Sequence, residues 1–217
     1  MVAIDNRNLK LIESLSDFIK ANAISEEIVD AAKEIDRKYF VPLKYLDKAY
    51  EESQIPLIEN YFMQPTSVYL LIINMAKIRP GLNVLEIGSN TGYSTAIIAN
   101  IVGTEGKVTS IERSLDLHNF AKKNVTNIQK VINKKFNVEF VYQDVSIGYW
   151  NNGPYDVIVS FYSSSEVPRE FVQQLKVDGR AVVPLGNANS NQIVTSYDKL
   201  TNTIYTKPIT VRFPKLK

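Results

Sequence analysis

The 217-residue chain has no cysteine and only one histidine, His118. The absence of cysteine excludes disulfide bonds, thiolate metal sites and a cysteine nucleophile. With a single histidine, a metal site built from several histidines is impossible, and a serine–histidine–acid triad would depend on His118 alone. We therefore expect chemistry that needs neither a metal nor a histidine base.

The chain also lacks a long apolar run and an excess of charge of one sign. Its longest apolar segment, VYLLIINMA at 68–76, is too short to span a bilayer, and the N-terminus has no apolar signal core. The formal net charge is +2, from 25 basic and 23 acidic residues, so there is no general attraction for a polyanion. These features favour a cytoplasmic protein with no membrane and no nucleic-acid partner.

The most informative segment that is present is NVLEIGSNTGYS at 83–94, where an apolar strand leads into a glycine-bounded loop and a helix. Gly88 and Gly92 permit backbone conformations, and a close approach by a ligand, that a Cβ would prevent. The N-terminus of the following helix offers unpaired N–H groups. Glu112 ends the next apolar run, where a carboxylate holds ribose hydroxyls in a βαβ unit. The sequence therefore predicts a nucleotide-type site.

Strands and helices alternate through the middle of the chain. The expected strands are 83–87, 107–112, 138–142, 155–160 and 180–185, with helices at 94–102, at 117–132 and after Pro168. Right-handed crossovers then give an α/β fold, with a doubly wound, mainly parallel sheet whose ligand loops meet at the carboxyl ends of the strands. The alternating pattern of 192–213 predicts a C-terminal hairpin that adds antiparallel edge strands.

The N-terminal part has a different pattern. Apolar positions at helical spacing in 7–40 predict two short helices, one of which begins after Ser25. Pro42 takes the chain out of helix, 40–65 should be irregular, and a helix is expected at 66–77. We therefore divide the chain into an N-terminal helical extension with an irregular loop, 1–65, and an α/β core that holds the nucleotide-type site, 66–217.

Several motifs resemble those of known methyltransferases. The pattern Glu86-x-Gly88-x-x-x-Gly92 after a strand resembles motif I of the class I S-adenosylmethionine-dependent methyltransferases, with Asn90 in place of the usual third glycine. Five further segments resemble, in order, those of the protein-L-isoaspartate O-methyltransferase family: DRKYFVP at 36–42, IRPGLNVLEIG at 78–88, NGPYDVIVSFYSSSEVP at 152–168, LKVDGRAVVPLG at 175–186 and VRFPKL at 211–216. The resemblance implies a Rossmann-like fold, S-adenosyl-L-methionine as cofactor, and a peptide or protein carboxylate as methyl acceptor.

The resemblance also implies site residues. Those on the cofactor side are Glu86, Gly88, Ser89, Asn90, Gly92, Glu112, Asp144 and Val145, with Glu112 at the ribose and Asp144 at the adenine amino group. Those on the substrate side are Ile55, Pro56, Leu57, Met63, Gln64, Val211 and Arg212. No metal ligand and no individual catalytic residue is assigned, because methyl transfer to a carboxylate depends mainly on alignment.

Two departures from the family keep the acceptor open. Met63 stands at the family's Ser or Thr position, and Phe161 to Ser165 replace an alanine-rich segment. The acceptor could be an isoaspartyl residue or the carboxylate of another, ribosomally made modified peptide. A tRNA base methyltransferase has a similar fold, but the near-neutral charge and the lack of an RNA-binding appendage disfavour it. The fourth alternative is a protein that binds the cofactor and has lost transfer. The oligomeric state is not predicted.

Overall fold

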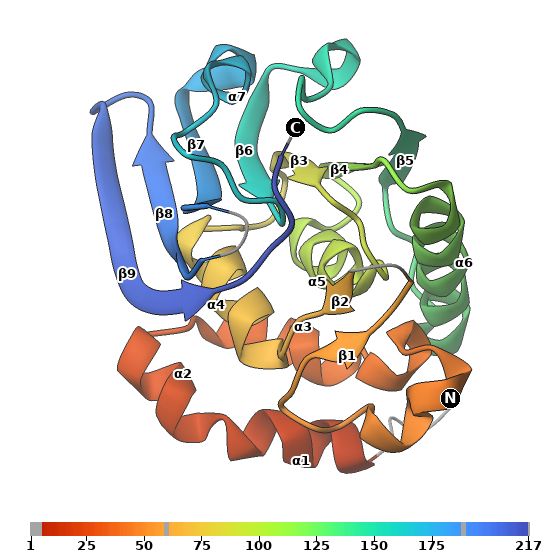
Figure 1. The fold of residues 1–217 in the computed structure, drawn as a ribbon. Helices are drawn as coiled ribbons and strands as arrows, with labels where there is room; N and C mark the ends of the chain where they lie inside the picture. The colour runs from red at the N-terminus through yellow and green to blue at the C-terminus, as the bar shows by residue number, and fades with distance from the viewer. Residues whose placement is uncertain (1–5, 59–60, 188–189, 217) are drawn as a thin grey trace.

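The computed structural model describes residues 6–58, 61–187 and 190–216, and its centre is one seven-stranded sheet (Figure 1). The strand order is β5-β4-β3-β6-β7-β8-β9. The strands are β3 (Asn83–Ile87), β4 (Lys107–Glu112), β5 (Val138–Tyr142), β6 (Tyr155–Ser160), β7 (Leu175–Leu185), β8 (Gln192–Asp198) and β9 (Thr203–Val211). The pairs among β3 to β7 are parallel, whereas β8 and β9 are antiparallel. The predicted fold class and C-terminal hairpin are confirmed.

The helices and short elements complete the order. The α-helices are α1 (Asn6–Ser14), α2 (Ser16–Asn22), α3 (Glu26–Glu34), α4 (Thr66–Met75), α5 (Tyr93–Val102), α6 (Leu115–Ile132) and α7 (Arg169–Gln174). The 3₁₀ turns are η1 (Arg37–Phe40), η2 (Leu43–Lys48) and η3 (Trp150–Asn152), and β1 (Ile55–Pro56) pairs with β2 (Phe62–Met63). None of the helices that the structure describes is long and apolar enough to cross a membrane.

The pleat of the sheet divides the core into two clusters. Successive side chains of a strand point to opposite faces, so Val84 of β3 packs in one cluster and Leu85 packs in the other. The first cluster lies under α3, α4 and α5 together with the N-terminal helices. The second contains Phe171 of the short helix α7. Both faces of the sheet are therefore covered, as a parallel sheet requires.

One local prediction about the N-terminal region needs correction, and one is confirmed. The N-terminal region forms three helices rather than two, because the helical run breaks at Leu15, between α1 and α2. Helix α3 begins after Ser25 as expected, but the Ser25 side chain makes no capping hydrogen bond, and its N–H donates to Asn74 Oδ1. Residues of this region, such as Ile12 and Ile28, are buried in the same cluster as α4 and α5. The division at residue 65 stays a prediction.

The order of the strands places a crevice at one edge of the sheet. From β3 the chain continues to β4 and β5 on one side, then crosses to β6 on the other side of β3. Ligands of open α/β sheets bind where the strand order reverses, beyond the carboxyl ends of the strands. Here that position lies between Gly88, which follows β3, and Phe161 and Tyr162, which follow β6.

Candidate cofactor and active site

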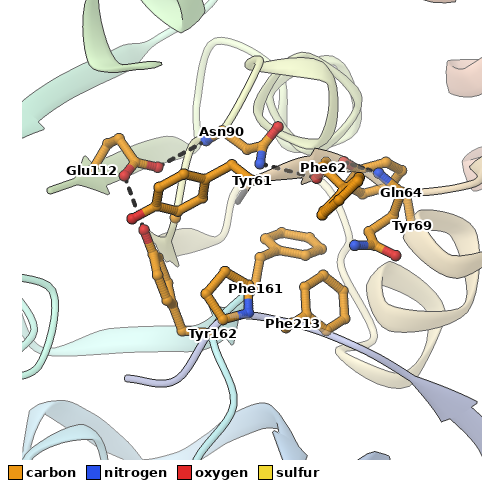
Figure 2. Close-up of a pocket in the computed structure, with 11 residues that line it drawn as sticks. Tyr61, Phe62, Gln64, Tyr69, Asn90, Glu112, Phe161, Tyr162 and Phe213 are labelled. Carbon is orange, nitrogen blue, oxygen red and sulfur yellow. Dashed lines mark hydrogen bonds between the residues drawn. The ribbon is translucent and has the colours of Figure 1, made fainter. Parts of the chain in front are cut away.

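Four parts of the chain meet at this crevice and leave a cavity of only about 10 Å³ (Figure 2). They are the β1–β2 segment with the following helix α4, the loop after β3 with the end of β4, the turn after β6, and the C-terminal tail. The lining residues are Tyr61, Phe62, Gln64, Tyr69, Gly88, Asn90, Glu112, Phe161, Tyr162, Phe213 and Pro214. The tail is held there because Ser163 N donates to Pro214 O at 2.8 Å and Leu216 N donates to Ser163 O at 2.8 Å.

Glu112 is the anchored carboxylate of the cavity and is 1% exposed. Its Oε2 accepts from the backbone N–H of Asn90 at 3.0 Å. Its Oε1 accepts from the N–H groups of Arg113 at 2.9 Å and Ser114 at 3.1 Å, and from the Tyr162 hydroxyl at 2.9 Å. These donors fix the orientation of the carboxylate at the end of β4, beside the glycine loop.

The two loop glycines have different neighbours. Gly88 has φ +96°, and a Cβ there would lie 2.7 Å from Cε2 of Tyr162, in the cavity. Gly92 has φ +84°, and its Cβ would lie 2.9 Å from Ala121 O in α6. Gly88 therefore faces the site, whereas Gly92 permits the packing of α5 against α6. Asn90, at φ 51°, reaches across the cavity rim, where its Nδ2 donates to Phe62 O at 3.2 Å.

The side chains of Glu86, in β3, and Ser89, in the loop, are buried beneath the loop backbone and do not line the cavity. Glu86 is fully buried, and its carboxyl group accepts from the hydroxyls of Ser94 at 2.5 Å, Ser110 at 2.6 Å and Thr95. Ser89 joins this network through Ser110, at 2.5 Å between the two Oγ atoms. Burial raises the pKa of Glu86 to about 7, although the three hydroxyls oppose this effect. In this conformation both residues support the loop from below.

The raised pKa of Glu86 predicts a pH-dependent stability. An unfolded glutamate has a pKa near 4.5, so the folded state binds the proton more tightly, and this stabilisation is lost as the pH rises from about 4.5 to about 7. Glu86→Gln removes the titration. The difference in unfolding free energy between Glu86→Gln and the parent should shift in favour of the variant by up to about 3 kcal/mol as the pH rises from 4.5 to 8, measured by urea denaturation.

A second glutamate supplies the control for this measurement. The hydrogen bond from Lys107 lowers the pKa of Glu139, so this group stabilises the fold at higher pH and loses that effect as the pH falls through its folded pKa. Glu139→Gln should therefore lose stability relative to the parent as the pH rises. Parallel pH curves for the parent and Glu86→Gln would contradict the prediction.

The predicted substrate-side residues separate into three groups. Ile55 and Met63 face each other across the β1–β2 pair, and both side chains are fully buried in the core rather than lining the cavity. The second group is Leu57 and its neighbour Pro56, and Leu57 lines an apolar groove together with Phe120 of α6. Pro56, in β1, is half-buried and does not line the cavity.

The third group joins the β2 segment to the C-terminal tail. Gln64 lines the cavity, and its Nε2 donates to Arg212 O at 3.2 Å. Val211 is buried in the core, and the Arg212 side chain is exposed, with its Nε donating to Asn191 Oδ1 at 3.3 Å. Gln64 is thus the predicted substrate-side residue that the structure brings to the cavity.

Asp144 and Val145 lie beyond Glu112, at the end of β5. Asp144 is exposed in a shallow depression that it shares with Arg113, and its Oδ1 accepts from Ser146 N at 2.8 Å. No α-helix begins here, so the alternative role of Asp144 as a helix cap is not realised. Val145 is fully buried in the second core cluster.

The sequence did not assign several aromatic residues of the cavity. Tyr69 comes from α4, Tyr61 from the β1–β2 segment, and Phe213 from the tail. Arg113, next to Glu112, donates from Nε to the Tyr61 hydroxyl at 3.0 Å. The available signal was position in the sequence, because Tyr61 precedes Met63 by two residues and Phe213 lies within VRFPKL, and position indicates the neighbourhood but not the direction of a side chain.

The sheet order, the glycine loop after β3 and the carboxylate at the end of β4 define the chain as a class I S-adenosylmethionine-dependent methyltransferase fold. The family model described as protein-L-isoaspartate(D-aspartate) O-methyltransferase matches residues 6–216. The chain therefore belongs to this family, as its motifs predicted.

Individual relatives agree with this assignment. A protein-L-isoaspartate O-methyltransferase of Methanothrix thermoacetophila is 30% identical over 190 residues, 88% of this chain and 86% of the relative. A solved protein-L-isoaspartate O-methyltransferase is 30% identical with a TM-score of 0.79, covering 96% of this chain but 65% of that longer chain. A solved structure of a putative protein-L-isoaspartate O-methyltransferase from Plasmodium falciparum, in complex with S-adenosyl-L-homocysteine, has a TM-score of 0.81 over 97% of this chain and 98% of its own. At 20% identity it supports the fold alone.

Proposed function

We propose that this chain transfers a methyl group from S-adenosyl-L-methionine to a carboxylate of a peptide or protein, with isoaspartyl residues as the first candidate acceptor. The observation that carries the proposal is the meeting of Gly88, Glu112 and the VRFP tail at the point where the strand order reverses. Family membership over residues 6–216 supports the same reaction.

The residues of the crevice suit the cofactor chemically. Glu112 offers carboxylate oxygens to the ribose hydroxyls, and it is held in place by three backbone N–H groups. Gly88 allows the backbone of the loop to approach the ligand, because it has no side chain on the cavity side. When bound, the cofactor supplies a methyl group on a positively charged sulfur. In this proposal Glu86 and Ser89 support the glycine loop from beneath through their hydrogen bonds.

The acceptor side needs alignment and exclusion of water more than proton transfer, because a carboxylate is already a nucleophile. Gln64, Tyr61 and Tyr69 provide polar groups around the cavity. Burial raises the pKa of Tyr69 to about 12, so its phenol stays protonated at neutral pH, and its oxygen accepts from Gln64 N at 3.1 Å. We infer that these groups position the acceptor carboxylate.

A specific observation keeps a second acceptor in view. No serine or threonine is among the described residues that line the cavity, and Met63, at the family's hydroxyl position, is buried in the core. The large side chains of Phe161 and Tyr162, which form the cavity wall after β6, also narrow the cavity. A carboxylate in another peptide, such as a ribosomally made modified peptide, fits this altered wall as the alternative substrate.

The test is methyl transfer from labelled cofactor to matched acceptors. We expect label on an isoaspartyl peptide as an alkali-labile ester, and none on the same peptide with normal aspartate or on bulk tRNA. Label on another peptide carboxylate alone would favour the second acceptor. Calorimetric binding of S-adenosylhomocysteine without transfer to any peptide would instead identify a cofactor-binding protein, and labelled tRNA would overturn the carboxylate assignment.

A further inference from the structure

The cavity between Gly88 and Glu112, which the ribose and the amino acid end of the proposed cofactor would occupy, is far too small for them. About 10 Å³ is close to the space that one water molecule needs, whereas pockets for small ligands usually measure about 300 Å³ or more. The space beside Gly88 is filled by the ring of Tyr162, which is 2% exposed. Figure 2 shows this ring between the loop after β3 and the tail, with its hydroxyl toward Glu112.

Tyr162 makes specific contacts on both sides of the cavity. Its hydroxyl donates to Glu112 Oε1 at 2.9 Å, and its ring lies over Gly88, where a Cβ would come within 2.7 Å of Cε2. The guanidinium of Arg113 lies 4.5 Å from the ring centroid, a cation–π contact on the remaining side. The phenol therefore uses the same carboxylate oxygen and the same glycine surface that the proposed cofactor needs.

The backbone of Tyr162 is held independently of the ring. Ser160 Oγ donates to Tyr162 O at 2.8 Å and accepts from Tyr162 N at 3.1 Å. The next residue, Ser163, forms a bridge with Lys215 of the tail. Because the main chain is held on both sides, rotation of the Tyr162 side chain about its own torsions opens the site without a movement of the backbone.

We propose that Tyr162 is an internal competitor of the cofactor, in which the phenol replaces a ribose hydroxyl at Glu112 and the ring covers Gly88. This inference rests on the proposed function, because it assumes that the cofactor binds in this crevice. The measured affinity is then the intrinsic affinity multiplied by the fraction of molecules in which Tyr162 has left the site. Tyr162 sets cofactor affinity without contributing an atom to methyl transfer.

The experiment measures calorimetric affinity for S-adenosylhomocysteine in the full chain and three variants. Tyr162→Phe keeps the ring but removes the hydrogen bond to Glu112, and Tyr162→Ala removes both. Tyr197→Phe is the matched control, because it removes a phenol hydroxyl that bonds Asn202 Oδ1 at 3.1 Å, away from the cavity. Thermal melts establish that each variant is folded.

We expect Tyr162→Ala to bind about tenfold more tightly than the parent, Tyr162→Phe to lie between them, and Tyr197→Phe to match the parent. If Tyr162→Ala binds S-adenosylhomocysteine and the other three proteins do not, Tyr162 blocks the site almost completely, which supports the inference most strongly. If the parent binds and both folded Tyr162 variants bind no more tightly, the inference is wrong while the cofactor assignment stands. If neither the parent nor any folded variant binds, the proposed cofactor site and this inference fail together.

Discussion

Replacing Arg37 by methionine is expected to lower the free energy of unfolding by about 4 kcal/mol, the largest effect on stability that we predict. Arg37 is fully buried. Its Nη1 donates to Ala49 O at 3.0 Å and Glu51 O at 2.6 Å. Its Nη2 donates to Ser53 O at 3.3 Å and Gln64 O at 3.1 Å. Methionine has a similar length but no donor, so these carbonyl groups would lose their partner in the interior.

The prediction is checked by urea denaturation of the parent, Arg37→Met and Arg79→Met. Arg79 is exposed in the turn before β3, so its substitution should change stability by no more than about 0.5 kcal/mol. Because Arg37 organises the segment that ends at Gln64, its loss should also expose residues 49–64 to faster proteolysis. Equal stability of the two variants would show that the buried guanidinium does not hold this segment.

Replacing Glu112 by alanine is expected to weaken binding of S-adenosylhomocysteine by about tenfold to a hundredfold. The proposed role of Glu112 is to accept from the ribose hydroxyls, and a hydrogen bond to a charged group contributes about 1.5–3 kcal/mol. The net effect is limited because in the parent the ligand must displace the Tyr162 hydroxyl from Oε1. Titration calorimetry gives the affinity directly.

Glu112→Gln is the matched variant, since it keeps the volume and one acceptor oxygen but removes the charge. It should bind more weakly than the parent and more tightly than Glu112→Ala. Because Asn90 N and Ser114 N also donate to this carboxylate, melting curves must accompany both variants. Equal affinity of the parent and a folded Glu112→Ala would mean that the ribose is held elsewhere.

The sequence by itself determined the order of the core elements and the class of site. Apolar runs separated by turn residues are local signals, and five parallel strands were predicted from them, four with the bounds that the structure has. The exception is β7, predicted from residue 180, which begins at Leu175 because that residue pairs with Tyr155 across a register shift in β6. The glycine loop and Glu112 were also predicted to lie together, because parallel crossovers bring the carboxyl ends of strands to one edge.

Only the tertiary structure decided which way the side chains of these segments face. Glu86 and Gly88 are two residues apart in one motif, yet Glu86 bonds hydroxyls below the loop and Gly88 borders the cavity. Phe62 and Met63 are adjacent in β2, and the alternation of the strand places Phe62 at the cavity and Met63 in the core. Tyr162 meets Glu112 across 50 residues of sequence. Such contacts depend on the packing of distant elements, which no local pattern of residues encodes.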